Sequence, residues 1–400
     1  MIDVEQALKR ITANVKTVQQ EYISLLKADR RILAKHLFAR ITKPPFDVSA
    51  MDGYAVRATD ITNLPTSMKV IGESLAGHAF NGKIGVGEAV RIFTGAPMPQ
   101  GSDSVILQEN TTLIDKTLVS IKDDQPEIKY VRSQGMDFKK GDRLILAGHR
   151  LTPWSITLAA AMGYANIPVR RKPTVAMLAN GNELILPGQP TEENKIICSN
   201  PFGIASIIER TGGQAKFLGI ADDCRSHLAK LCATGLQYDI LVTIGGISFG
   251  DYDLVVDVLK SQGMSLVLRQ VAMRPGKPMM FGTFKNTYVI GLPGNPVSAL
   301  ICARVFLVPL IEAMLGHQYQ AASLQTAITT TPLPENGPLQ RYMRAITKAN
   351  SSGELYVTVF KSQDSSELSQ FASSNVLVVR APYTPALDAG KRVRIMPLDF

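Results

Sequence analysis

The sequence predicts a multi-domain protein that combines an α/β unit, built on a mostly parallel sheet, with β-rich units. The chain has 400 residues, whereas a single hydrophobic core rarely extends beyond about 250–300 residues. Between residues 173 and 316, short apolar runs alternate with helical patterns, which is typical of a parallel sheet covered by helices. After residue 320, apolar and polar residues alternate, which indicates a small antiparallel barrel or sandwich.

The composition limits the class of protein. With 45% apolar and 19% charged residues, the chain is neither disordered nor a coiled coil. Its four cysteines form no C-x-x-C pair and its five histidines lack metal-ligand spacing, so we expect core thiols and no zinc or haem site. The net charge of +9 permits an anionic partner. Because the sequence has no recognised nucleic-acid motif or long basic run, a nucleic-acid binder is the weaker interpretation.

The first 40 residues are predicted to be helical. Apolar residues recur at helical spacing at Val4, Leu8, Ile11, Val15 and Val18. Acidic residues within the first five positions, without an apolar core before a cleavage site, are unlike a secretory signal. We therefore expect a cytoplasmic protein.

A β-rich segment and a helix are predicted next. Short apolar runs broken by Gly, Pro, Asn and Asp predict strands at 68–71, 89–93, 104–108 and 118–121. An Ala-rich stretch from Pro153 to Met162 predicts a helix, because proline suits the first helical turn.

The remaining elements follow from the two patterns named first. In the α/β unit we expect strands at 175–179, 216–220 and 240–244, and helices at 203–210, 225–235 and 254–262. In the final unit we expect strands at 324–330, 344–347, 355–360, 376–379 and 393–395. The apolar stretch 297–311 contains Arg304 and Pro309 and is short for a membrane span. We therefore predict a core helix there and no membrane association.

Three loops of the α/β unit are suited to an anion. Gly245 and Gly246 follow a predicted strand and precede a helix, where backbone N–H groups can approach a ligand. Arg274 and Lys277 lie on a turn stiffened by two prolines. The segment 293–296 is a further Gly/Pro turn that leads into a helix. Each loop alone is equally an ordinary turn, but three in one α/β unit favour a phosphate or oxyanion site.

Acidic residues follow two of the predicted strands. Glu183 follows the strand 175–179, and Asp222 and Asp223 follow the strand 216–220. Carboxylates near a phosphate suit Mg²⁺, which takes oxygen ligands and bridges substrate phosphates. Each acid alone is more often a helix cap or a solvated charge.

Taken together and in order, the segments 49–55, 93–97, 245–248 with Asp253, 274–278 and 291–298 resemble the molybdopterin molybdenumtransferases of the MoeA type, which are related to the E domain of gephyrin. The resemblance runs from about residue 25 to the C-terminus. It implies an elongated discontinuous domain (1–45 and 141–172), an inserted β-rich domain (46–140), an α/β molybdopterin-binding domain (173–320) and a C-terminal β-barrel (321–400).

The resemblance also implies an activity, namely the last step of molybdenum cofactor biosynthesis. Molybdenum from molybdate is inserted into adenylylated molybdopterin, with Mg²⁺-dependent cleavage of the phosphoanhydride and release of AMP. It implies a homodimer with the cleft between subunits, and contacts with the upstream molybdopterin adenylyltransferase and with cofactor-accepting enzymes. A pterin carrier, sensor or scaffold of the same fold is the alternative. Molybdenum and tungsten are not distinguished by the sequence.

Carried over by position, the resemblance predicts three sets of site residues. The catalytic residues are Asp52, Thr94, Asp137, Glu183, Asp222, Arg274 and Lys277. The residues that bind the molybdopterin are Gly245, Gly246, Ser248, Asp253, Pro293, Gly294, Asn295 and Ser369, and the metal ligands are Glu183 and Asp222. Members of the family commonly have Lys at position 274 and a basic residue near Gln270. The segment before Asp222 is one residue shorter than usual, so Asp222 and Asp223 can exchange roles.

Overall fold

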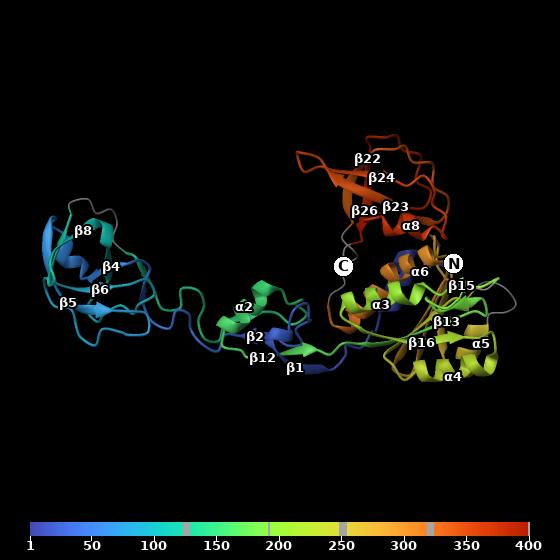
Figure 1. Ribbon diagram of the computed structural model, residues 1–400, viewed down its shortest axis with the longest axis horizontal. Coiled ribbons are helices and arrows are strands. Elements are labelled where there is room, and N and C mark those ends of the chain that lie inside the picture. The colour runs from blue at the N-terminus through green and yellow to red at the C-terminus, as the bar shows by residue number, and fades with distance from the viewer. Residues whose placement is uncertain (123–128, 191–192, 248–253, 318–323, 399–400) are drawn as a thin grey trace.

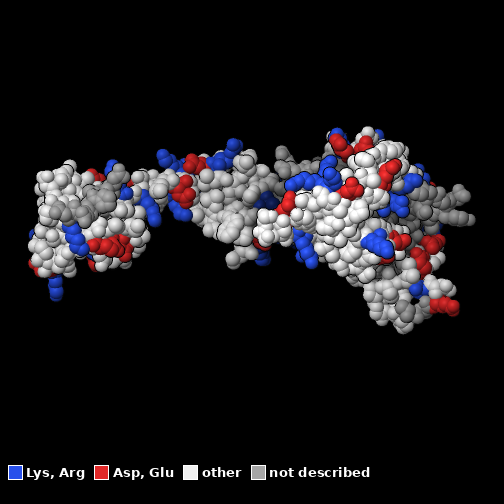
Figure 2. Space-filling view, turned by 90° about the horizontal axis from the view of Figure 1, so that it is seen from above, with Lys and Arg blue, Asp and Glu red and all other residues white. Residues whose placement is uncertain are grey.

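The protein is an elongated chain of separate units (Figure 1). The computed structural model describes residues 1–122, 129–190, 193–247, 254–317 and 324–398. A β-rich unit lies at one end, a slender unit lies in the middle, and the α/β unit and the barrel lie together at the other end (Figure 1). Lys and Arg are interspersed with Asp and Glu along the face that Figure 2 shows. The predicted fold class is confirmed, while the exact domain boundaries stay predictions.

The α/β unit is built on a six-stranded sheet in the order β16-β13-β17-β21-β20-β18. The first four strands are parallel, and β20 and β18 are antiparallel to their neighbours. The strands are β13 (Thr174–Asn180), β16 (Gln214–Ala221), β17 (Ile240–Ile244), β18 (Ser265–Gln270), β20 (Pro278–Phe284) and β21 (Thr287–Leu292). Because the central parallel strands β13, β17 and β21 are covered on both faces, their burial is nearly continuous, as in β17, where all five residues are buried.

Helices cover both faces of this sheet (Figure 1). Two of them, α4 (Arg225–Gly235) and α5 (Leu254–Ser261), share one apolar cluster with Leu178 and Leu241 of the sheet. On the opposite face, α3 (Asn200–Thr211) and α6 (Pro296–Cys302) share the larger cluster with Met177 and Val242. The alternation along the strands therefore places successive side chains in two different cores.

The apolar stretch that begins at residue 296 forms a continuous, mostly buried helical segment of the α/β core. Helix α6 continues through a π-helical segment η4 (Ala303–Leu307) into α7 (Val308–Met314). Within the described residues, Pro296–Met314 is the one helical stretch long and apolar enough to span a membrane, and 78% of its most apolar window is buried inside the protein. The π-helical segment ends two residues before Pro309, whose ring disfavours ordinary helical hydrogen bonding. This burial agrees with the predicted core helix.

The predicted N-terminal helix is much shorter than expected. Helix α1 (Val4–Thr12) is capped by Asp3, whose side chain accepts a hydrogen bond from Gln6 N at 2.7 Å. It ends before Asn14, which has a positive φ of 60°. The prediction of a helix to about residue 40 is wrong, because the following chain pairs with distant strands. The buried residues of α1 belong to the α/β core.

The slender middle unit is made from segments far apart in the sequence. Strand β1 (Gln20–Ser24) pairs with β12 (Asn166–Arg170), and β2 (Leu37–Phe38) pairs with β11 (Arg143–Ile145). Helix α2 (Pro153–Ala161) packs over them and confirms the helix predicted there. Its N-cap, Thr152, forms a reciprocal capping box with Ser155.

The inserted β-rich unit has a six-stranded sheet in the order β7-β4-β6-β5-β9-β8. Its strands include those predicted from the short apolar runs. They are β4 (Gly53–Val56), β5 (Thr66–Ser74), β6 (Glu88–Ile92), β7 (Ser104–Leu107), β8 (Thr111–Asp115) and β9 (Leu118–Ile121). A short ladder of β3 (Val48–Ser49) and β10 (Val131–Arg132) lies where the chain enters and leaves this unit.

The C-terminal unit is a closed barrel, one of the two architectures that the alternating pattern predicts, but it is not wholly antiparallel, because one of its strand pairs is parallel. Its strands pair in the cycle β23-β24-β22-β26-β25, and β25 returns to β23. They are β22 (Gln325–Thr329), β23 (Gln340–Ala349), β24 (Leu355–Val359), β25 (Val376–Arg380) and β26 (Arg392–Pro397). Strand β19 (Met273–Arg274) of the preceding unit adds in parallel to β23. This pairing ties the basic turn to the barrel.

Candidate active site

A cavity of about 620 Å³ lies at the carboxyl ends of the parallel strands. Ligands of open α/β sheets bind at this edge. Its lining includes Glu183, Gly245, Gly246, Pro293, Gly294 and Asn295 of the predicted site. Three predicted loops, which follow β13, β17 and β21, therefore meet around one hollow.

The glycine loop after β17 has no room for side chains. Gly245 and Gly246 have φ values of 83° and 65°, a region that favours glycine. A Cβ atom at Gly246 would lie 2.6 Å from Val255 Cγ2 and 2.9 Å from Asn180 Nδ2. The Cα atoms of Gly245 and Gly294 face each other, because a Cβ on either would lie 3.7–3.9 Å from the other's Cα. The backbone itself thus forms this part of the pocket.

Asp223 joins the two loops that carry the predicted acids. Its carboxylate accepts hydrogen bonds from Asn180 Nδ2 at 2.9 Å and from the backbone N–H of Asn182 at 3.3 Å. Its own N–H donates to Asn182 Oδ1 at 3.0 Å. Asn180 is 8% exposed, and its Oδ1 has no hydrogen-bond partner among the described residues. Asp223 therefore shapes the loop that presents Glu183.

Asp222 points to a different partner. Its Oδ2 lies 2.9 Å from His227 Nδ1 on α4, and its side chain is 67% exposed. Asp222 does not line the described cavity, whereas Glu183 does. The two acids predicted as joint metal ligands thus differ in their surroundings.

Glu183 lies beside a thiol. Burial first, and the negative charge of Glu183 second, raise the pKa of Cys198 to about 11. Both residues line the cavity. The Cys198 thiol is therefore neutral near neutral pH and contributes apolar surface next to the carboxylate.

The basic turn lies at the junction with the barrel. Arg274 and Lys277 are both exposed, and neither is among the residues that line the described cavity. Gly276 between them has a φ of 104°, and a Cβ there would lie 2.3 Å from Cys302 Sγ. The turn is thus pressed onto α6, while Pro278 at its end reaches the cavity wall. Two other predicted residues, Ser248 and Asp253, lie outside the described residues.

The barrel reaches the cavity through a serine pair that sequence reasoning missed. Ser366 lines the cavity, and Ser365 O accepts a hydrogen bond from the backbone N–H of Val297 at 3.2 Å. Asn295 Nδ2 donates to Ser365 Oγ at 3.0 Å. The predicted Ser369 instead is exposed on the short helix α8 (Leu368–Ala372). The sequence Asp-Ser-Ser, a turn-forming run, was the available signal.

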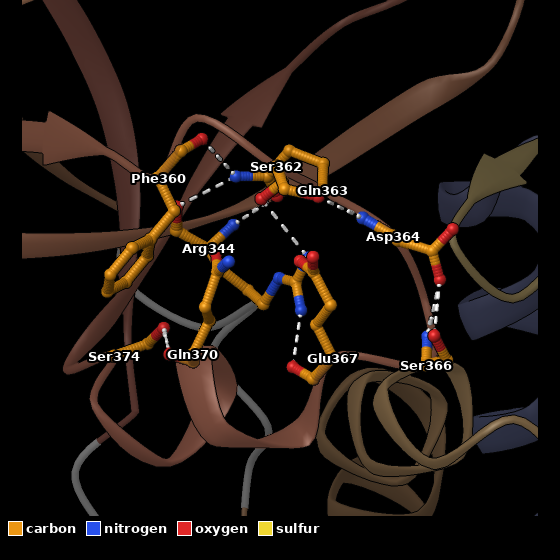
Figure 3. Close-up of polar contacts among 9 residues, drawn as sticks. All are labelled: Arg344, Phe360, Ser362, Gln363, Asp364, Ser366, Glu367, Gln370 and Ser374. Atoms are coloured by element: carbon orange, nitrogen blue, oxygen red, sulfur yellow. Dashed lines mark hydrogen bonds and ion pairs between the residues drawn. The ribbon is translucent and has the colours of Figure 1, made fainter.

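A buried guanidinium holds this serine turn in place (Figure 3). Arg344 on β23 is 1% exposed, and its Nη1 donates to Glu367 O at 2.7 Å. Its Nη2 donates to Ser362 O and to Glu367 Oε2, at 3.3 and 3.4 Å. Gln363 closes the network through reciprocal hydrogen bonds with the Arg344 backbone. Both ends of the turn that carries Ser365 and Ser366 are therefore fixed to the barrel.

Three predicted residues lie far from the cavity of the same chain. Asp52 and Thr94 contact each other in the β-rich unit, where Thr94 N and Thr94 Oγ1 both donate to Asp52 Oδ1 at 2.7 Å. Asp137 pairs with Lys43 at 3.4 Å near the entry to that unit. The β-rich unit lies at the opposite end of the molecule from the α/β unit (Figure 1). One chain alone does not bring these residues to the cavity.

The described carboxylates suit a metal ion that is shared with a substrate. Among the residues that the structure describes, no group of three or more His, Cys, Asp or Glu side chains forms a protein-only metal site. Glu183 faces the cavity without a side-chain hydrogen bond to another described residue. Mg²⁺ commonly takes one or two carboxylates together with substrate phosphates and waters. Glu183 therefore fits such an ion, whereas Asp222 is paired with His227 and does not line the described cavity.

The fold and cavity define a protein with an α/β domain that carries a ligand-sized cavity at the carboxyl ends of its parallel strands. Residues 176–313 match the family described as a probable molybdopterin binding domain. Residues 2–163 match the MoeA N-terminal region (domain I and II), and residues 326–398 match the MoeA C-terminal region (domain IV).

Relatives extend this match over the whole chain. The molybdopterin molybdenumtransferase of Haemophilus influenzae is 34% identical and covers 100% of this chain and 99% of its own length. That of Bacillus subtilis is 30% identical over 99% of this chain and 94% of its own. A solved molybdopterin biosynthesis MoeA protein from Pyrococcus horikoshii superimposes with a TM-score of 0.85 at 28% identity, covering 100% of both chains. The chain belongs to the molybdopterin molybdenumtransferase family, whose enzymes act in molybdenum cofactor biosynthesis.

Proposed function

We propose that this enzyme inserts molybdenum from molybdate into adenylylated molybdopterin, with Mg²⁺-dependent cleavage of the phosphoanhydride and release of AMP. The observation that carries the proposal is the meeting of the glycine loop, the Gly/Pro loop and Glu183 around a cavity of about 620 Å³. Backbone loops at strand ends suit the flat pterin and its phosphate. Glu183 supplies the carboxylate that a phosphate-bound cation needs.

The loops have separate tasks in this proposal. Gly245, Gly246 and Gly294 offer backbone to the pterin without side chains between them. Ser366 and Asn295 add polar side chains to the lining of the cavity. Bound Mg²⁺ would neutralise charge on the phosphoanhydride, and Glu183 with Asp222 would hold it. Ser248, Asp253 and Ser369 remain predicted contacts of the molybdopterin.

Arg274 and Lys277 are proposed to hold molybdate or the leaving phosphate. Both are exposed on a turn that is fixed by Gly276 against α6. A guanidinium presents a planar fork to an oxyanion, whereas an ammonium acts as a point charge, so the two side chains can hold one tetrahedral anion from different directions. Tungstate has the same shape and charge, and competition with molybdate measures the preference.

A second copy of the chain is proposed to supply Asp52, Thr94 and Asp137. Asp52 and Thr94 belong to the β-rich unit, which lies at the opposite end of the molecule from the α/β unit that carries the cavity (Figure 1). The slender middle unit exposes large apolar side chains, as expected of a surface that pairs with another protein. They include Tyr22, Leu26, Phe38, Ile41, Leu146 and Trp154, of which Leu26 is 98% and Trp154 82% exposed. Transfer of the adenylylated molybdopterin from an adenylyltransferase, and of the finished cofactor to cofactor-accepting enzymes, stays a prediction.

The decisive experiment mixes the purified protein with adenylylated molybdopterin, Mg²⁺ and molybdate, and measures both AMP and active cofactor. We expect AMP release with wild type and its loss in a Glu183→Ala, Asp222→Ala double variant. Glu193→Ala, which removes a nearby acid that does not line the described cavity, is the matched control. Binding of the pterin without AMP release would identify a carrier or sensor instead. Undiminished release by the double variant would contradict the proposed roles of the acids.

A further inference from the structure

Arg91 on β6 joins the two chain segments that carry Asp52 and Thr94. Its Nη1 donates to the backbone carbonyl oxygen of Gly53, the residue after Asp52, at 3.0 Å. Its Nη2 donates to Gln108 Oε1. The backbone N–H of Gln108 in turn donates to the carbonyl oxygen of Asp52 at 3.2 Å. The guanidinium group is therefore bonded to the residue that follows Asp52 and, through Gln108, to the backbone of Asp52 itself.

Two aromatic rings keep this guanidinium group in place. The Cζ atom of Arg91 lies 5.0 Å from the ring centre of Tyr54 and 4.9 Å from that of Phe93. Tyr54 is buried and lies directly opposite Arg91 in the antiparallel pairing of β4 with β6. Phe93 is the residue before Thr94. A guanidinium group within about 6 Å of an aromatic ring centre is attracted to the ring, so Arg91 contacts the segments of Asp52 and Thr94 from one place.

The segment after Asp52 is itself held tightly by the sheet. Gly53 lies opposite Ile92 of β6 and Leu107 of β7. A Cβ atom at Gly53 would overlap the backbone oxygen of Ile106. Arg91 therefore binds a carbonyl group whose position is set by two neighbouring strands.

The side chains of Asp52 and Thr94, in contrast, are not held by a core. Both residues are exposed. The backbone hydrogen bond from Thr94 first, its hydroxyl second, and the positive charge of Arg91 after them lower the pKa of Asp52. The placement of the pair thus depends on the hydrogen bonds between its members and on the two segments that Arg91 joins.

We propose that Arg91 is a positioning residue of the reaction, which holds Asp52 and Thr94 as one unit for the cavity of a second copy of the chain. This inference rests on the proposed function, in which the pair completes the partner's site. Arg91 acts through the two segments and does not contact the substrate. A misplacement of about 1 Å in a reacting site can cost about 100-fold in rate, so a residue of this kind affects turnover from a distance.

Three variants of the full chain test this role. Arg91→Met removes the charge and both donors but keeps an unbranched side chain next to the two rings. Arg91→Lys keeps the charge and loses the planar fork. Lys116→Met is the matched control, because it removes another positive charge from the groove of about 550 Å³ that Arg91 lines. Thermal melting confirms that each variant is folded.

Two readouts separate positioning from a purely structural role. NMR titration of the Asp52 carboxyl carbon should give a higher pKa in Arg91→Met, because a favourable positive charge is lost, and a nearly unchanged pKa in Arg91→Lys. Steady-state AMP release should give a kcat about tenfold lower in Arg91→Met at unchanged KM, and an intermediate kcat in Arg91→Lys. Lys116→Met should behave like wild type in both measurements.

An unchanged pKa of Asp52 in Arg91→Met, or equal losses of kcat in Arg91→Met and Lys116→Met, would overturn the proposal. A wild-type kcat in Arg91→Met would overturn it as well, because turnover would then not depend on how Arg91 holds the pair. Failure of the proposed function has a different signature, namely no AMP release by wild type. In that case the titration of Asp52 still tests whether Arg91 acts on the pair.

Discussion

A single oxygen of Asp52 accepts two hydrogen bonds from Thr94, one from the backbone N–H and one from the hydroxyl, each 2.7 Å long. The backbone bond first, and the hydroxyl bond second, lower the pKa of Asp52 below its ordinary value, and Arg91 adds to this effect. Both donors favour the charged carboxylate. If Asp52 completes a partner's cavity, it enters that cavity as an anion.

The first prediction concerns this carboxylate. Thr94→Val keeps the N–H donor and removes the hydroxyl, so the pKa of Asp52 should rise part of the way to its ordinary value. Because the folded pKa is depressed, the stabilisation is present above the unfolded pKa of about 3.9 and is lost as pH falls through the folded pKa. NMR titration of the carboxyl carbon measures the change. Asp115, which is bonded similarly by Thr117, should not respond and serves as the control.

The second prediction concerns the anchor of the serine turn. Arg344→Met should lower the free energy of unfolding by about 3 kcal/mol, because it leaves two part-buried carbonyl groups and the Glu367 carboxylate without their donor. Urea denaturation measures this loss. The control is Arg392→Met, whose exposed pair with Glu354 should contribute about 1 kcal/mol or less. Equal losses in the two variants would contradict the anchoring role.

The third prediction separates two glycines of the molybdopterin cavity. Gly246→Ala places a Cβ against Val255 and Asn180 at a positive φ, and should destabilise the protein by at least about 1–2 kcal/mol. At Gly294 a Cβ would meet only Gly245 Cα, at 3.7 Å. Gly294→Ala should therefore fold normally but bind molybdopterin more weakly, which calorimetry and fluorescence titration can measure separately.

The fourth prediction assigns the acid after β16. Asp223→Ala should destabilise the Asn180–Asn182 loop by about 1 kcal/mol, because two donors lose their acceptor. Asp222→Ala should change the stability by less than about 0.5 kcal/mol, because its side chain is 67% exposed. If Asp222 is the functional acid, its variant slows AMP release at unchanged stability. If AMP release is slowed by Asp223→Ala and not by Asp222→Ala, Asp223 is the functional acid instead.

The fifth prediction uses the thiols as reporters. Hydrogen bonds from Ser226 and the neighbouring backbone lower the pKa of the exposed Cys224, whereas burial raises the pKa of Cys198 to about 11 and that of Cys232 to about 12. A maleimide at pH 8 should therefore label Cys224 first. In a Cys224→Ser background, Glu183→Gln should lower the pKa of Cys198 modestly, which the pH dependence of labelling reveals. An unchanged pKa of Cys198 in this variant would mean that the charge of Glu183 does not act on the thiol.

The sequence predicts elements well where the pattern is local. Helix α4 has the predicted bounds, because its apolar positions and flanking residues determine it without distant partners. The N-terminal prediction failed for the opposite reason. Gln20–Ser24 follows an apolar helical pattern but pairs with β12, about 145 residues later, and tertiary pairing overrides local propensity.

The candidate site, too, could be predicted from the sequence only where a local pattern or a general fold rule determines it. The loops at the strand ends of the α/β unit converge because parallel strands end at one edge, a rule that needs no coordinates. The sequence did not indicate that Ser366 lines the cavity, because the turn that carries it is set by Arg344, whose burial and reach are tertiary. The distance of Asp52 from the cavity likewise depends on how the units are arranged and not on any local pattern.

The extended arrangement of the units predicts how two different inactivating mutations combine when both chains are made in one cell. If each reaction centre combines one chain's cavity with its partner's distant arm, a lesion in the arm and a lesion in the cavity harm different centres. Two inactive alleles, one altered at Asp52 and one at Glu183, would then produce mixed pairs in which one centre keeps both intact halves. Their coexpression would restore part of the activity that neither allele has alone.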